Sequence, residues 1–129
     1  MSYDILLVVE QTEHVEQIFA ALNNVHPNIN LTCESERENK VPFFDVMIHM
    51  QTAKLSFGWY HKPNWAGQYL HYHSFVPLGW KKSLLNGLKS RLLTICSVEH
   101  IEEAVHEVYR VLGNNGYPNI FIQNHFMEY

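Results

Sequence analysis

The spacing of hydrophobic residues divides the chain into a strand-rich first part and a helical second part. Residues 5–9 form an uninterrupted apolar run, which is typical of a strand buried on both faces. Apolar side chains then recur at helical spacing over residues 13–25 and alternate with polar ones over residues 29–34, which predicts a helix and a half-buried strand. Residues 41–50 and 55–60 alternate as two more strands with a short polar connection, which predicts an antiparallel hairpin.

Beyond Pro63 the pattern becomes helical. Residues 64–76 show no clear period and are expected to form a long ordered loop. A helix is expected to start at Pro77, and its apolar face is expected to consist of Trp80, Leu84, Leu88, Leu92 and Ile95. Ser97 is expected to cap the next helix, whose apolar stripe is Ile101, Ala104, Val105, Val108 and Leu112, with Gly113 just past its end. A turn around residues 114–118 and a short last helix, which is capped by Asn119 and continues through Phe126, complete the pattern.

The predicted fold class is therefore α+β. Residues 1–62 are expected to contain a strand, a packed helix, another strand and a β-hairpin, and residues 63–129 to form a helical lobe. A chain of 129 residues with 47% hydrophobic and 17% charged residues has the composition of a soluble globular protein. Cys33 and Cys96 are isolated in the sequence, which suits a reducing compartment. With no apolar run of membrane-spanning length and no leader-like N-terminus, we expect an intracellular protein, nuclear or cytoplasmic, that does not associate with membranes.

The charges are distributed unevenly and change this picture. The formal net charge is −4, but residues 54–97 contain six Lys or Arg residues and no Asp or Glu. The flanks are acidic: residues 1–53 carry a net −6 and residues 98–129 a net −4. Aromatic residues and histidines are interleaved with the cations of the central segment. Cations that neutralise phosphates, mixed with rings that stack on bases, are typical of a nucleic-acid-binding surface.

A series of short motifs resembles a known family in order and spacing. It resembles the back half of the polymerase of Penelope-like retroelements, a group found widely in animals, and it extends over nearly the whole chain. At the N-terminus, Tyr3 and Asp4 are similar to a truncated Tyr-x-Asp-Asp turn of reverse transcriptases. The other motifs are Leu22-Asn23, His26–Ile29, Val41–Val46, Tyr60–Pro63, Gly67–Leu70, His73-Ser74, Pro77-Leu78 and Asn115–Pro118.

The resemblance implies the C-terminal part of a palm subdomain followed by a helical thumb, which in this family is often described as a helix-turn-helix-like region. The intact family enzyme is an RNA-directed DNA polymerase that uses Mg²⁺ and deoxynucleotides. Asp4 matches the second Asp of the catalytic pair and would be a catalytic, metal-binding residue only if a missing upstream palm and fingers segment were supplied. Two-metal catalysis needs several carboxylates, so we expect no polymerase activity and no cofactor for this chain alone. Whether it forms part of an active enzyme stays open.

In a polymerase thumb, cations hold the backbone of a duplex without reading its sequence. The expected partner is therefore an RNA–DNA or DNA duplex. Asp45 is placed by the resemblance in a structural hairpin. The alternatives are that the rings fill a core and the cations form a solvated helix face, in a protein-interaction or structural module, or that the chain is a non-functional retroelement remnant. The expected nucleic-acid-binding residues are Lys62, Trp65, Tyr69, His71, Lys81, Lys82, Lys89 and Arg91.

Overall fold

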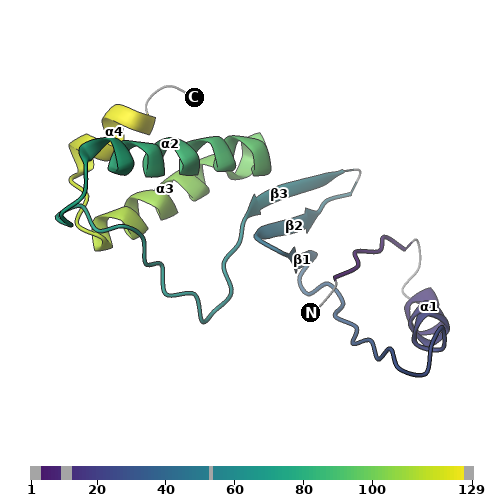
Figure 1. Ribbon diagram of the computed structural model, residues 1–129. Coiled ribbons are helices and arrows are strands. Elements are labelled where there is room, and N and C mark those ends of the chain that lie inside the picture. The colour runs from purple at the N-terminus through teal and green to yellow at the C-terminus, as the bar shows by residue number, and fades with distance from the viewer. Residues whose placement is uncertain (1–3, 10–12, 53, 127–129) are drawn as a thin grey trace. The chain divides into compact units, whose positions relative to one another are not determined.

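The computed structural model describes residues 4–9, 13–52 and 54–126 (Figure 1). The predicted α+β class is confirmed: a three-stranded antiparallel sheet is followed by a helical region. The described residues separate into two compact units, Met1–Glu38 and Asn39–Tyr129. No helix in the described part of the chain is both long and apolar enough to cross a membrane. In chain order the elements are α1 (Glu13–Asn23), β1 (Lys40–Phe43), β2 (Val46–Met50), β3 (Leu55–Trp59), α2 (Leu78–Ile95), α3 (Val98–Asn114) and α4 (Asn119–Phe126).

The first unit contains α1 but neither of the two strands predicted around it. Residues 4–9 and 29–34 have no strand structure, so both strand predictions are wrong. Their apolar side chains are largely solvent-exposed: Ile5 is 63% exposed, Val8 75% and Ile29 48%. A strand is stable only when a neighbouring strand satisfies its backbone N–H and C=O groups. An apolar or alternating sequence does not by itself supply that neighbour.

The second unit begins with the sheet, whose strand order is β1-β2-β3. The prediction of one continuous strand over residues 41–50 is wrong, because this segment forms a hairpin of its own. Phe43 pairs with Val46, and Phe44, in the loop between them, has a positive φ of 55°. Pro42 lies in β1, an edge strand, where a residue without an N–H is tolerated. The predicted hairpin that joins residues 50 and 55 is confirmed by the antiparallel pairing of β2 with β3.

Helices α2, α3 and α4 enclose the main hydrophobic core of the second unit. The predicted apolar stripe of α3 is confirmed, because its members are either buried or packed against the core. The predicted face of α2 is rotated: Lys81 and Leu85 are buried, whereas Trp80 is 64% exposed. Gly113 does not end α3, which continues to Asn114; the residue with positive φ is Gly116, at 85°. The buried core residues are Leu85, Leu88, Leu92, Ala104, Val108, Leu112, Tyr117, Ile122 and Phe126.

The sheet is attached to the start of α3 by reciprocal hydrogen bonds between two residues. Phe57 N donates to Ser97 Oγ and Ser97 N donates to Phe57 O, both at 2.8 Å. Ser97 is the N-cap residue of α3, as predicted, but its hydroxyl bonds the sheet and makes no bond to its own helix. Ser56, buried in β3, adds a 2.9 Å bond between its Oγ and Nε2 of His100. β3 is therefore fixed against α3, and the residues that follow β3 leave from a defined position.

The turn between α3 and α4 is fixed by Asn115, which is only 8% exposed. Its Oδ1 accepts a bond from Tyr69 N at 3.1 Å, and its Nδ2 donates to Gly67 O at 2.9 Å and to Val111 O at 2.8 Å. Its backbone oxygen accepts a bond from Tyr72 N at 2.9 Å. One buried amide thus joins the end of α3 to a loop that lies more than 40 residues earlier in the chain.

We expect Asn115→Ala to lower the free energy of unfolding by about 2–4 kcal/mol, because the substitution leaves the N–H of Tyr69 and the C=O of Gly67 without partners. Urea unfolding followed by circular dichroism measures the change. The neighbouring Asn114 is exposed and provides the control: Asn114→Ala should change stability by no more than about 0.5 kcal/mol. Equal effects of the two substitutions would contradict the role assigned to Asn115.

Candidate nucleic-acid interface

The cations predicted to contact nucleic acid do not share one surface. Lys81 is only 9% exposed. Its Nζ donates a 3.0 Å bond to Ser74 O and lies 5.3 Å from the centre of the Tyr72 ring. A buried ammonium is stabilised by such a carbonyl and an aromatic face. Lys81 therefore anchors the loop before α2 to the helix, and its charge is used inside the fold.

Arg91 is engaged by Asp45, the acidic residue of the β1–β2 turn. Its Nε donates to Asp45 Oδ2 at 2.7 Å, and its Nη2 donates to the same oxygen. The Asp45 backbone oxygen also accepts a bond from Tyr60 N. This arrangement agrees with the structural role expected for Asp45. It also means that a phosphate at Arg91 has to compete with a carboxylate already in place.

Lys82 and Lys89 lie on the outer side of α2. Lys82 is exposed and Lys89 is half-buried. Asn86, also exposed, lies between them, and the spacing of four and then three residues places the three side chains on one stripe of the helix. The sequence of α2 contains no Asp or Glu. We call Lys82, Asn86 and Lys89 the α2 outer stripe.

The solvent-facing side of α3 has the opposite charge. Glu99, Glu102 and Glu103 are all exposed. Glu99 pairs with Lys54, and Glu107 pairs with Arg110. A polyanion is therefore attracted to the outer side of α2 and repelled by the first turns of α3.

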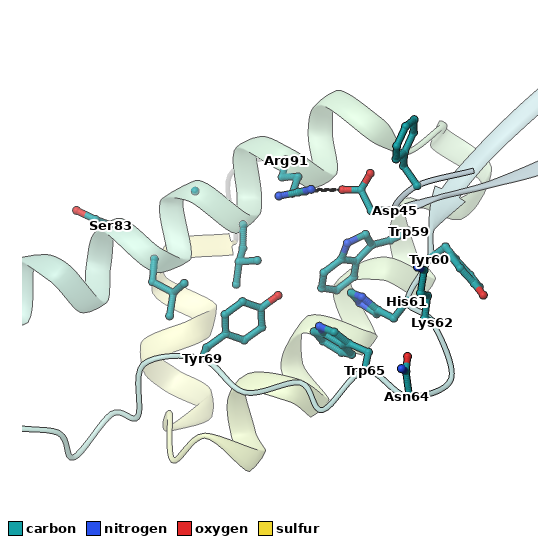
Figure 2. A pocket seen from close by; sticks show the side chains of 14 residues that line it. Asp45, Trp59, Tyr60, His61, Lys62, Asn64, Trp65, Tyr69, Ser83 and Arg91 are labelled. Atoms are coloured by element: carbon teal, nitrogen blue, oxygen red, sulfur yellow. Dashed lines mark hydrogen bonds and ion pairs between the residues drawn. The ribbon is translucent and has the colours of Figure 1, made fainter. Parts of the chain in front are cut away.

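Two of the predicted aromatic residues, Trp65 and Tyr69, line a groove between the loop after β3 and one flank of α2 (Figure 2). The groove has a volume of about 700 Å³. The ring of Trp65 stacks on His61 with centroids 3.5 Å apart and an angle of 4° between the planes. Trp59 meets both rings edge-on, at 4.0 Å from His61 and 6.1 Å from Trp65. Lys62, which is exposed, and Arg91 also line the groove.

Burial lowers the pKa of His61 below its ordinary value of 6.5. Its Nε2 is buried and has no hydrogen-bond partner among the described residues. The pKa of His49 is lowered as well, by burial first and then by the nearby His100 and Lys40, against an opposing effect of Glu103. His49 and His100 stack with their ring centres 4.0 Å apart. The neutral forms of His61 and His49 are therefore favoured in the folded protein.

His71, the remaining predicted contact residue, is exposed, and its ring lies against the α3–α4 turn at Gly116. A Cβ added to Gly116 would come within 2.5 Å of Cε1 of the His71 ring. The ring therefore fits against a position where only glycine leaves room and where positive φ also favours glycine. His71 O accepts bonds from both the backbone N and the Oγ of Ser74, which shapes the loop that Lys81 holds.

Asp4 is exposed and belongs to the first unit. In the described residues, no group of three or more His, Cys, Asp or Glu side chains is arranged to hold a metal ion. Tyr3, the other residue of the predicted turn, lies outside the described residues. A two-metal centre needs several carboxylates around two ions, and the described part of the chain holds no such group around Asp4.

Sequence reasoning missed three features of this region. The Asn114-Asn115-Gly116 sequence predicts a turn but not the buried side-chain bonds of Asn115, because an Asn before Gly indicates a turn and says nothing of burial. Trp80 was assigned to the core and is exposed. Gly87 lines the groove, and nothing lies within 4 Å of the position that its Cβ would occupy.

The last two helices, with the glycine-containing turn between them, define a helix-turn-helix arrangement. Residues 68–127 match the family model described as the animal helix-turn-helix domain, so the chain carries a domain of this kind there. The predicted helix-turn-helix-like region is confirmed by this match, which makes no reverse-transcriptase assignment. No curated protein and no solved structure matches the chain.

We expect stability to fall as the pH is lowered from about 7 to about 5. The pKa values of His61 and His49 are lower in the folded state, so the unfolded chain binds protons first as pH falls through 6.5. His61→Phe keeps a ring against Trp65 and removes the titrating group, and it should reduce the pH dependence of the thermal midpoint. An unchanged dependence in this variant would show that His61 does not contribute.

Proposed function

We propose that this protein binds the sugar–phosphate backbone of duplex nucleic acid through the outer side of α2, without reading sequence. The observation that carries the proposal is the α2 outer stripe: two lysines and an amide on the exposed side of a helix free of acidic residues. Lys and Asn side chains are ordinary phosphate contacts. A helix-turn-helix domain at residues 68–127, which contains α2, supports nucleic acid as the partner.

Lys62 extends the proposed surface beyond α2 because it is exposed at the groove. Lys81 and Arg91 contribute indirectly, the first by holding the loop before α2 and the second by tying α2 to the β1–β2 turn. The acidic side of α3 limits how a duplex can approach. We therefore expect one docking orientation, with the duplex over α2, and a nuclear or cytoplasmic site of action.

We further propose that the chain is the C-terminal part of a reverse transcriptase related to those of Penelope-like retroelements. The ordered series of motifs along the sequence supports this origin, and so does the succession of a β-hairpin and a helical domain. The sheet would then be the remnant of a palm and α2–α4 the thumb, with residues 62 and 63 as the boundary. In the intact enzyme Mg²⁺ would serve nucleotidyl transfer, with carboxylates from an upstream segment.

Binding to an RNA–DNA duplex should weaken with salt, and Lys82→Ala combined with Lys89→Ala should flatten the dependence. Each phosphate contact contributes about −0.9 to the slope of log K against log salt, so losing two contacts changes the slope by about 1.8. Fluorescence anisotropy over a salt series measures both slopes. The control is Lys40→Ala with Lys54→Ala, which changes the net charge equally but lies in and next to the sheet. A control that flattens the slope as much would refute the proposed surface.

Primer extension tests the assignment to a reverse-transcriptase fragment. The chain alone, with Mg²⁺, deoxynucleotides and a primed RNA template, should incorporate no nucleotides, because Asp4 by itself cannot hold two catalytic ions. An open reading frame upstream of Met1 that encodes further strands and an Asp-bearing motif would support the proposed origin. Template-dependent incorporation by this chain would contradict the proposal that it lacks the catalytic carboxylates.

A further inference from the structure

Apart from Lys62 at its edge, the groove beside α2 is a surface that the duplex proposal leaves unused. One of its walls is a flank of α2, where Leu84, Gly87 and Arg91 follow each other at intervals of three and four residues. Trp80 continues this flank one turn toward the start of the helix and is 64% exposed. The opposite wall is the loop after β3, which supplies the rings of Trp65 and Tyr69 (Figure 2).

The chemistry of the walls combines flat rings with positive charge. Trp65 and Tyr69 are half-buried, so each presents part of a ring to the groove. Of the charged lining residues, Lys62 and Arg91 are basic and Asp45 is acidic, and Asp45 is already paired with Arg91. The lining therefore has a surplus of positive charge. The ligand that complements aromatic faces and a net cation is an anionic chain that carries flat, stackable groups.

We propose that this groove holds unpaired nucleotides, with a base against the Trp65 and Tyr69 rings and a phosphate at Lys62. The volume of about 700 Å³ lies in the range of sites that hold small organic molecules. Base–aromatic stacking tolerates any sequence, which agrees with a protein that does not read bases.

The inference rests on the proposed function and makes it more specific, because the same helix carries both surfaces. The α2 outer stripe and the groove flank lie on opposite sides of the buried face of α2, which consists of Lys81, Leu85, Leu88 and Leu92. A duplex on the first surface and a single-stranded extension in the second would be held by one rigid helix. The preferred ligand is therefore the junction between a duplex and an unpaired strand.

Gly87 allows the groove to be blocked without disturbing the core. A Cβ at Gly87 meets nothing within 4 Å, and the same is true of Gly79 in the same helix. Leu favours helix over Gly at either position, so neither substitution should impair folding. Gly87→Leu places an apolar side chain in the groove, whereas Gly79, which does not line it, provides a matched control as Gly79→Leu.

The test compares a blunt RNA–DNA duplex with the same duplex carrying a single-stranded DNA extension, by anisotropy at low salt. The extended duplex should bind the wild-type chain about tenfold more tightly for one stacked base. Gly87→Leu should abolish this gain and leave affinity for the blunt duplex unchanged, and Gly79→Leu should retain the gain. Blunt binding without any gain from the extension, or a gain that survives Gly87→Leu, would overturn the inference and leave the proposed function standing.

A second measurement keeps the two proposals separate if the blunt duplex does not bind. The tryptophan fluorescence of a Trp80→Phe variant, whose remaining tryptophans are Trp59 and Trp65 in the groove lining, is followed on addition of a single-stranded oligonucleotide. Quenching that Gly87→Leu removes and Gly79→Leu preserves supports the groove site even where duplex binding fails. No response to the oligonucleotide overturns it, and a response to a proline-rich peptide alone would assign the groove to protein recognition.

Discussion

The helical domain depends on one buried side chain, the amide of Asn115. Its three side-chain hydrogen bonds use both its acceptor and its donor atoms, and two of them reach the loop at Gly67 and Tyr69. The hydroxyl of Tyr117 reinforces the same junction with a 2.7 Å bond to Leu70 O. A polar network of this kind specifies one arrangement because each alternative leaves a buried group unpaired. The irregular loop before α2 is therefore held on the α3–α4 turn by several hydrogen bonds.

This junction explains why the basic residues have different roles. Because the loop is fixed on the α3–α4 turn, Ser74 O lies within hydrogen-bond distance of Lys81 Nζ. The ammonium group of Lys81 therefore bonds the loop and is not available to a partner. Arg91 is likewise engaged within the protein, because its guanidinium group donates to the Asp45 carboxylate. The charge left for a partner is then carried by Lys62, Lys82 and Lys89. A protein with a net charge of −4 can still attract phosphates, because the field near a helix depends on local charges within roughly a Debye length.

The sequence predicted the elements that repeat a regular pattern, and the structure differs where tertiary contacts decide. α3 was predicted with its buried stripe because five apolar residues recur at helical spacing. On α2 both Leu84 and Leu85 are apolar, so periodicity could not show which of the two faces the core. Lys81 is buried because Ser74 O and the Tyr72 ring contact its ammonium group, and no local sequence pattern indicates these contacts. The two-residue turn at Phe44 and Asp45 interrupts residues 41–50, whose alternating pattern indicated one continuous strand. For residues 4–9 the apolar run predicted a strand, but such a run carries no information about a partner strand, and the segment has no strand structure. The groove combines residues from the hairpin, the loop and α2, so its existence could not be read from any one of them.

The region that matches the helix-turn-helix family is shorter than the compact unit that contains it. The match covers residues 68–127, whereas the compact unit begins at Asn39. Trp59 of β3 packs against the helical core, and Phe57 and Ser97 bond β3 to α3. The start of α3 is thus tied to the sheet, and most of the ring lining of the groove lies outside the match. If the groove holds unpaired nucleotides, the helices alone cannot form the site. They contribute Arg91, but Trp59, His61 and Trp65 come from the hairpin and the loop that follows it.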